Sequence, residues 1–439
     1  MRDPAARLQL TDRDAIRHLN APLPGAHFLR SALAQRWASE ARLVPFEWRN
    51  EFEVAAPRLG FVSRPDEWCD AQLHAAAALT LELQREAVAH GFDLKDASAW
   101  NVLFRGTQPI FCDLLSFEAL RDRRWWAAGQ FARQFILPLL LSRRRGLRAH
   151  QCFAVWRDGV PSDSARRLLG PSRYASRYWP LLMDAGHAAK PNKAQAPASI
   201  EAVRRFREGL HASLRWLLRG VEPGHGRATP TTWSEYAGQR EHYTGDSLQL
   251  KRECLAAWLA RERPAWVLDL GCNTGEFTRM ALEADADVVA VDADHECVQR
   301  LFLSSQSQRL HPLVAALDDL PGGRGWAGRE QAGLAERLGQ HFDMVLMLGL
   351  VHHLMIAASI PMAQVAQFAA HCTRRWLIVE WIDGTDRQAR LLCEQRQRVV
   401  SEFGIDAQRV AFEAAGFSVV ATEPLGEVPR TLALLRRDG

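Results

Sequence analysis

The stretch that decides the fold is Val267–Phe277, VLDLGCNTGEF. It begins as a short apolar run typical of a buried strand, continues as a loop of small residues, and enters a helix at Glu276. Glycine in such a turn reaches positive φ without steric cost and lets a ligand approach the backbone, while the helix start offers unpaired N–H groups. The spacing is G-x-x-x-G, unlike the G-x-G-x-x-G of pyrophosphate sites, and Asp269 would oppose a diphosphate. The loop therefore favours a cationic ligand.

Outward from this loop, the C-terminal part reads as strands and helices in strict alternation. Short apolar runs typical of parallel strands covered on both faces lie at 266–270, 288–291, 313–317, 344–348 and 376–379. Two further runs, 417–421 and 431–435, are joined by a link too short for a crossover helix, so we expect them to pair antiparallel. The pattern predicts an α/β, Rossmann-like, doubly wound domain of seven strands, five parallel plus a terminal antiparallel hairpin.

Carboxylates stand at the carboxyl ends of the next two predicted strands. Asp292 ends the second strand, where a carboxylate accepts both hydroxyls of a ribose. Asp318 and Asp319 follow the third strand, where a side chain meets an adenine amino group. Together with Asp269 at the first strand, these acids predict one crevice that binds a nucleoside.

This constellation resembles the class I S-adenosylmethionine-dependent methyltransferases over about residues 246–437. The resemblance implies S-adenosyl-L-methionine as the cofactor and no metal. It implies these cofactor-binding residues: Asp269, Gly271, Asn273, Gly275, Asp292, Asp318 and Asp319. Asn273 departs from the family's D-x-G-x-G-x-G pattern, which has a glycine there. Asparagine tolerates left-handed φ, so we expect the turn to survive.

The acceptor side is expected after the fourth and fifth strands. His352 and His353 follow the fourth strand, where an imidazole titrates near neutrality and is a candidate base toward a hydroxyl or an amine. The alternative is that one of them only caps the helix or bonds the backbone. Candidate acceptor contacts, which packing alone would also explain, are Trp326 and Arg329 in an insertion and Glu380 and Trp381 at the end of the fifth strand.

The class of acceptor is narrowed by what the sequence lacks. No N-P-P-[YF] follows the fourth strand, and 55 basic against 51 acidic residues give a net charge of +4, so there is no strong nucleic-acid signal. The two-part arrangement, D-A-S-x-x-N ahead of D-L-G-C-N-T-G-E-F, is similar to a bacterial family that includes nodulation-associated methyltransferase-like proteins. That resemblance implies a small-molecule or glycan-like acceptor.

The N-terminal half carries a second pattern. Asp96 and Asn101 have the spacing D-x4-N, and Asp113 follows twelve residues later, with a predicted β-hairpin between them. The spacing resembles the catalytic loop and metal-binding Asp of protein-kinase-like phosphotransferases. No glycine-rich phosphate loop precedes it, and Lys95 is the only lysine before position 190. We therefore expect an α+β, degenerate kinase-like module that selects or shapes the acceptor, or simply a hairpin with capping polar residues.

Linker-like segments predict three parts: an N-terminal domain at 1–185, a linker at 186–230 with an amphipathic helix at 200–218, and the methyltransferase domain at 231–439. The eight cysteines lack metal-site spacing, and no apolar run approaches the ~20 residues that span a bilayer, so we expect a cytoplasmic protein without a transmembrane segment. Nothing indicates the oligomeric state.

Lysine is rare in this chain. Only four of the 55 basic residues are lysines, which we interpret as lineage bias and not as a site. The alternative to an enzyme is a regulatory or scaffold protein that binds S-adenosylmethionine without turnover and uses its kinase-like half as an interaction module.

Overall fold

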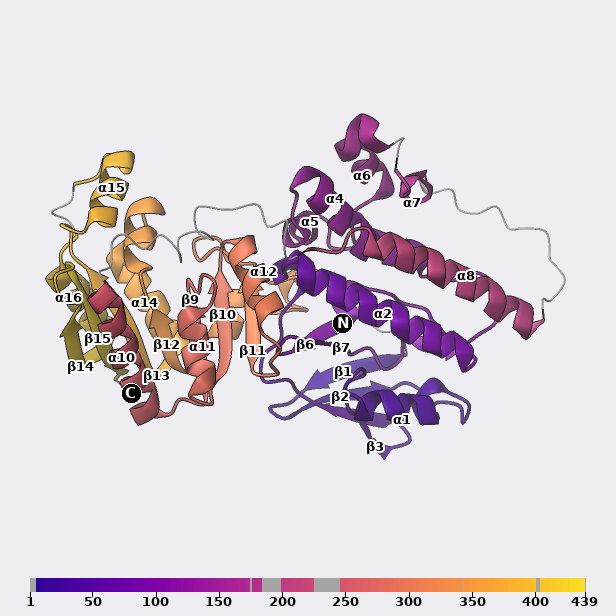
Figure 1. The fold of residues 1–439 in the computed structure, drawn as a ribbon. Coiled ribbons are helices and arrows are strands. Elements are labelled where there is room, and N and C mark those ends of the chain that lie inside the picture. Colours follow the sequence, from indigo (N-terminus) through magenta and orange to yellow (C-terminus); the bar gives the residue numbers. More distant parts are fainter. Residues whose placement is uncertain are drawn as a thin grey trace. The chain divides into compact units, whose positions relative to one another are not determined.

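In the computed structural model, the chain divides into two compact units, residues 1–227 and 228–439 (Figure 1). The structure describes residues 5–173, 176–183, 199–224, 245–339, 341–399 and 403–438. Two parts of the predicted linker at 186–230, namely 186–198 and 225–230, lie outside these ranges. Its predicted helix is present as α8 (Ile200–Arg219), within the first unit.

In the described part of the second unit, one seven-stranded sheet has the order β11-β10-β9-β12-β13-β15-β14. Neighbours from β11 to β13 pair parallel, whereas β15 runs antiparallel to both β13 and β14. A Rossmann-like α/β fold is therefore confirmed. The strands are β9 (Trp266–Leu270), β10 (Asp287–Asp292), β11 (Leu310–Val314), β12 (Phe342–Met347), β13 (Thr373–Ile382), β14 (Phe417–Pro424) and β15 (Arg430–Arg437).

The third strand differs in position from the prediction. β11 spans Leu310–Val314, three residues earlier than the apolar run at 313–317, and includes Pro312. A proline that would break a central strand is tolerated here because β11 is at the edge of the sheet and pairs only with β10. Asp318 and Asp319 consequently lie in the loop beyond the strand and not at its tip.

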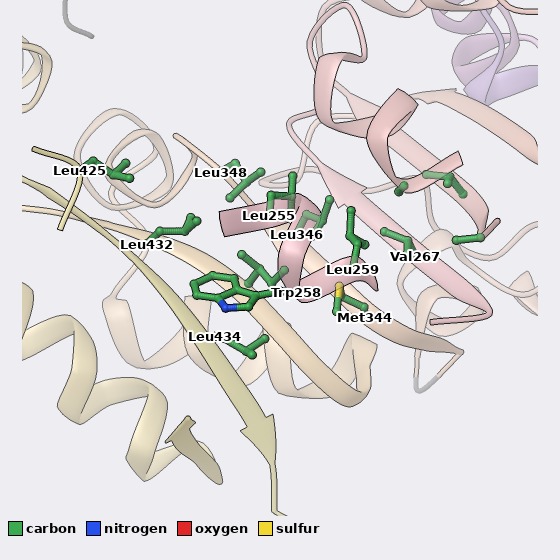
Figure 2. Close-up of a cluster of buried hydrophobic side chains, with 14 residues drawn as sticks. Leu255, Trp258, Leu259, Val267, Met344, Leu346, Leu348, Leu425, Leu432 and Leu434 are labelled. Carbon is green, nitrogen blue, oxygen red and sulfur yellow. The ribbon is translucent and has the colours of Figure 1, made fainter. Parts of the chain in front are cut away.

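Helices α10 (Gly245–Glu262) and α11 (Glu276–Glu283) pack together next to the sheet and cover a core of buried apolar side chains (Figure 2). The core residues drawn in Figure 2 include Leu255 and Trp258 of α10, Val267 of β9, Met344 and Leu346 of β12, and Leu432 and Leu434 of β15. The other helices of this unit are α12 (His295–Ser304), α13 (Leu334–Leu338), α14 (Met362–Cys372), α15 (Arg387–Arg396) and α16 (Ile405–Ala414).

The first unit contains a four-stranded antiparallel sheet with the order β1-β2-β4-β3 and two strand pairs, β5-β8 and β6-β7. The predicted hairpin is confirmed, because β6 and β7 pair antiparallel between Asn101 and Asp113. The strands are β1 (Ala6–Leu10), β2 (Asp14–Leu19), β3 (Glu47–Asn50), β4 (Glu53–Pro57), β5 (Phe92–Leu94), β6 (Val102–Arg105), β7 (Gln108–Phe111) and β8 (Phe117–Ala119).

The long helices α2 (Asp70–Ala89) and α8 lie side by side in the first unit (Figure 1). Arg207 of α8 is buried and donates to Asp93 of β5 over 2.5 Å, which fixes α8 to this unit. The remaining helices are α1 (Ala32–Ser39), α3 (Ala128–Phe131), α4 (Leu137–Arg145), α5 (Ala149–Val155), α6 (Ser162–Leu169) and α7 (Trp179–Met183). Among the described residues, none of the helices has the length and apolar character needed to cross a membrane.

Candidate functional site

A cavity of about 410 Å³ lies at the carboxyl ends of the parallel strands, between the loops that follow β9, β10, β11 and β12. Five predicted site residues line it: Gly271, Asn273, Asp292, Asp318 and His353. The sheet order explains the convergence, because β9 is central and its neighbours β10 and β12 end at the same edge. Ligands of open α/β sheets bind at this edge.

The loop after β9 forms one end of the cavity and is held in left-handed backbone conformations. Gly271, Asn273 and Gly275 have φ of 74°, 51° and 82°, so Asn273 takes the conformation predicted for it. A Cβ on Gly275 would lie 2.4 Å from Cδ1 of Leu301 on α12. Gly275 does not line the cavity. A glycine is required at this position because of its positive φ and its close packing against α12.

Asp292 is the best-positioned carboxylate of the cavity. Its Oδ2 accepts from the backbone N–H of Asn273 and its Oδ1 from that of Asp294, each over 2.8 Å. These bonds fix the orientation of the carboxylate at the end of β10. Burial raises the pKa of Asp292 to about 6. An acid held this way accepts further hydrogen bonds from a ligand's hydroxyls, and ionisation makes it a stronger acceptor.

Asp269 and Asp319 have different positions from Asp292. Asp269 is buried beneath the loop, does not line the cavity, and accepts from the hydroxyl of Thr278 over 2.6 Å. This bond ties β9 to α11. Burial raises the pKa of Asp269 to about 6, with a further contribution from the charge of Asp292. Asp318 and Asp319 are both exposed, but only Asp318 is a lining residue of the cavity; Asp319 forms a β-bridge with Ala316 within its own loop.

The opposite end of the cavity is cationic. Lys251 of α10 and Arg430 of β15 are buried and line it. Glu380 accepts from Lys251 over 2.5 Å and from Arg430 over 3.1 Å, and Asp386 accepts from Arg430 over 2.8 and 3.0 Å. Neither carboxylate lines the cavity. The ammonium of Lys251 also lies 4.6 Å from the ring centroid of Phe277, beside the loop after β9.

His353 begins a π-helical turn, His353–Ala357, and lines the cavity near its cationic end. Single π turns inside helices are frequent at functional sites. Burial, and secondarily the charge of Arg430, lower the pKa of His353 to about 4. Its imidazole is therefore neutral at physiological pH. His352 is buried and does not line the cavity, although the two rings are 4.0 Å apart.

The four predicted acceptor contacts do not line the cavity. Trp326 is 73% exposed, and Arg329 is exposed in the same insertion. Trp381 is buried on β13, on the face of the sheet opposite to that of Glu380 because successive residues of a strand alternate in direction. Glu380 is buried and accepts from Lys251, which is itself a lining residue of the cavity.

Lys251 and Arg430 are the functional candidates that the sequence analysis missed. Lys251 and Glu380 are 129 residues apart in the sequence, so no local pattern predicts that they pair. One signal was available in the composition. In a chain that uses arginine for nearly every basic position, Lys251 is the lysine that lies within the predicted α/β domain, and the interpretation of lysine usage as lineage bias passed over it.

The N-terminal pattern forms a hydrogen-bonded cluster beside the β6–β7 hairpin. Asp96 accepts from the side chain of Gln130 over 2.7 Å, and Asn101 donates to the backbone carbonyl of Asp96 over 3.3 Å. Asp113 accepts from the hydroxyl of Ser116. These bonds fit polar residues that stabilise a hairpin, and the kinase-like interpretation stays a prediction. Among the described residues, no group of three His, Cys, Asp or Glu side chains is placed to hold a metal.

Comparison with known proteins identifies the domain and a relative of most of the chain. Residues 236–422 match the family described as a methyltransferase domain. The nodulation protein NoeA of Rhizobium meliloti (strain 1021) is 31% identical over 371 residues, which cover 80% of this chain and 75% of that protein.

Solved structures match more distantly. Magnesium protoporphyrin IX methyltransferase of Synechocystis PCC 6803 with bound SAH is 16% identical, covering 44% of this chain and 84% of that one, with a TM-score of 0.31. The N-methyltransferase NodS of Bradyrhizobium japonicum WM9 is 12% identical, covering 44% and 98%, with a TM-score of 0.33. TM-scores this low carry no argument about function. The match to the methyltransferase domain and the geometry of the cavity are the basis for a proposed function.

Proposed function

The chain belongs to the family of the nodulation protein NoeA, and from this premise we propose that it is an enzyme that methylates a small-molecule or glycan-like acceptor. S-adenosyl-L-methionine is its cofactor. The single observation that supports this proposal best is the cavity of the methyltransferase domain, which is acidic at one end, cationic at the other, and bounded by a left-handed glycine loop.

The cavity's chemistry fits S-adenosylmethionine in one orientation. The nucleoside offers hydroxyl and amino donors, which suit the carboxylates of Asp292 and Asp318. The methionine part carries a carboxylate, which suits the ammonium of Lys251 at the opposite end. Gly271 and Asn273 shape the wall between these ends, and Asp269 holds that wall in place through Thr278. The charges of the side chains thus select both the ligand and its direction.

When bound, S-adenosylmethionine supplies a methyl group on a positively charged sulfur; the carbon–sulfur bond breaks as a bond to the acceptor forms, and its electron pair stays on sulfur. The protein's task is to position the acceptor in line and to take up its proton. We assign proton removal to His353 because it lines the cavity and its imidazole is neutral; since its pKa of about 4 makes it a weak base, it takes the proton as the new bond to the methyl carbon makes that proton acidic, and not before. His352 supports the neighbouring turn from its buried position.

The direct test is calorimetry of the full chain with S-adenosylhomocysteine. We expect binding, and we expect Asp292→Ala to abolish it while circular dichroism and the melting temperature show a folded protein. No binding at millimolar ligand would contradict the proposal. Binding that persists in Asp292→Ala would contradict the ribose assignment alone. If S-adenosylhomocysteine binds but His353→Ala leaves function in cells unchanged, the chain is a binding protein without turnover.

A further inference from the structure

The open end of the β6–β7 hairpin, in the first unit, gathers polar side chains that the methyl-transfer site does not use. Asn101 directly precedes β6, and Asp113 lies two residues beyond the end of β7. The backbone N–H of Cys112 donates to the carbonyl of Asn101 over 2.8 Å, and the side chain of Asn101 donates to the carbonyl of Asp96 over 3.3 Å. Asp96, Asn101 and Asp113 are therefore neighbours in the folded unit.

A cation lies beside this cluster. Nη2 of Arg17, on β2, donates to the backbone carbonyl of Cys112 over 2.8 Å and is 3.9 Å from Oδ1 of Asp113. The longer contact is electrostatic, so among the described residues the carbonyl of Cys112 is the only hydrogen-bond acceptor of this guanidinium. Arg17 therefore keeps N–H donors for a ligand. Its side chain is 11% exposed and that of Asp113 is 14% exposed, so solvent reaches both.

Oxygens that suit a metal ion lie next to this cation. Asn101 is 2% exposed, and its Oδ1 accepts no hydrogen bond from the described part of the chain. Asp113 accepts from the backbone N–H of Leu115 over 3.2 Å and from the hydroxyl of Ser116, which orients its carboxylate and leaves lone pairs unused. Magnesium in nucleotide sites takes one or two such oxygens, and phosphates and water complete its shell. Such a site needs no group of three carboxylates.

The charges favour a metal ion and a phosphate together over either ion alone. A phosphate by itself would meet the carboxylates of Asp96 and Asp113, and a metal ion by itself would meet the guanidinium of Arg17. When magnesium binds to Asp113, it compensates the negative charge that faces Arg17, and the guanidinium then pairs with a phosphate oxygen. Residues that only cap a turn would not couple the two ions in this way.

We propose that the first unit binds a magnesium-bound polyphosphate, the chemistry shared by nucleoside triphosphates and pyrophosphate, at the open end of the β6–β7 hairpin. Asn101 and Asp113 hold the magnesium ion, and Arg17 donates to the phosphates. Asp96, oriented by a 2.7 Å bond from the side chain of Gln130, borders the site. The site belongs to a different unit from the methyl-donor cavity, so each ligand can be titrated while the other is saturating.

The first test is calorimetry of the full chain with ATP. S-adenosylhomocysteine is kept saturating, so that the adenosine part of ATP cannot occupy the methyl-donor cavity. We expect ATP to bind in magnesium and to bind at least about tenfold more weakly in EDTA, because the metal links the phosphates to the carboxylate. Pyrophosphate as the second ligand separates the two sources: equal affinity identifies the polyphosphate as the whole ligand, and tighter ATP binding identifies a nucleotide. No binding of either at millimolar concentration with magnesium would overturn the proposal.

Variants test the assigned residues. Arg17→Gln and Asp113→Asn are each expected to weaken the magnesium-bound ligand about tenfold or more, because each removes a charged partner. Arg7→Gln, an exposed position on the neighbouring strand β1, is the matched control and should leave the affinity unchanged. Melting temperatures and unchanged S-adenosylhomocysteine affinity show that a variant is folded. Unchanged ATP affinity in folded Arg17→Gln and Asp113→Asn would overturn the proposal.

Manganese in place of magnesium gives a readout that needs no variant. Bound Mn²⁺ broadens the nuclear magnetic resonance signals of nearby nuclei. With ATP and S-adenosylhomocysteine both present, we expect the backbone amide signals of Asn101, Cys112 and Asp113 to broaden selectively, while that of Asp292 in the methyl-donor cavity does not. Broadening at Asp292 and not at the hairpin would place the metal elsewhere and overturn the proposal, and it would leave the proposed methyl transfer untouched.

Discussion

The assignment of Lys251 to the donor's carboxylate leads to a prediction about two ligands that differ in that group alone. S-adenosylhomocysteine has the α-carboxylate, and its decarboxylated form lacks it. Wild-type chain should bind the first much more tightly, and Lys251→Met should lose this preference. The comparison is needed because the substitution also leaves Glu380 with one cation fewer, a disturbance that both ligands experience equally.

The expected magnitude follows from the burial of the ammonium. Lys251 is 2% exposed, so a carboxylate bound to it is largely desolvated. Removing one partner from such a hydrogen-bonded charge pair costs about 2–4 kcal/mol, roughly 30- to 700-fold in dissociation constant. Lys251→Met should therefore weaken S-adenosylhomocysteine by about that factor and the decarboxylated ligand by less than about threefold. Lys251→Arg keeps a cation and should recover part of the preference.

Isothermal titration of both ligands into the wild-type chain and into Lys251→Met gives four dissociation constants, which together form a double-mutant-type cycle between the lysine and the ligand's carboxylate. Arg261→Met is the matched control, since Arg261 lies on the same helix, is half exposed and pairs with Glu262. Melting temperatures establish that each variant is folded. A folded Lys251→Met that still prefers S-adenosylhomocysteine by the wild-type factor would refute the reasoning, because the carboxylate would then be bound elsewhere.

Three other predictions concern the same domain. Burial raises the pKa of Asp292 to about 6 in the ligand-free cavity, and hydroxyl donors favour the ionised carboxylate. The affinity for S-adenosylhomocysteine should therefore rise with pH through about 6 and level off above it. Titration calorimetry at several pH values measures this affinity, and a profile that is flat from about pH 5 to 7 would contradict the prediction. Gly275→Ala should lower the free energy of unfolding in urea by about 1–3 kcal/mol, because the new Cβ would lie 2.4 Å from Leu301. In the double variant with Leu301→Ala, the two losses of stability should sum to less than their separate values, because the smaller side chain removes the clash. His353→Gln should lower methyl transfer by about 10²–10⁴ without changing S-adenosylhomocysteine affinity, whereas a folded His352→Gln should retain most activity; equal losses would contradict the assignment of the base.

The sheet was predictable from the sequence because each buried parallel strand has a local pattern, a short continuous run of apolar residues. Apolar runs between helices indicate strands, and a link too short for a helix forces an antiparallel pair, as β14 and β15 show. The exception is β11, where Pro312 shifted the expected boundary. Its position depends on being at the edge of the sheet, which is a property of the strand order and not of the residues alone.

The site was predictable only where residues follow directly from strand ends. Asp292 and the loop from Gly271 to Asn273 are of this kind, and they line the cavity. The choice between His352 and His353 depends on how a π turn rotates two adjacent side chains, which sequence spacing does not reveal. Lys251 of α10 and Arg430 of β15 each pair with Glu380 of β13, and these three elements come together only in the folded domain.

The buried network of Lys251, Glu380, Arg430 and Asp386 is better explained by binding than by stability. Replacing buried ion pairs with well-packed apolar residues is often neutral or stabilising by about 1–4 kcal/mol, because desolvation of the charges offsets their attraction. The domain has an apolar core in the same layer, around Leu255 and the other residues of Figure 2, which shows that its helices and sheet pack well without charges. The charges occur instead where α10 and β15 reach the cavity: Lys251 and Arg430 are among its lining residues, and Glu380 and Asp386 are their partners. This placement follows if the cations serve ligands and the carboxylates make their burial tolerable.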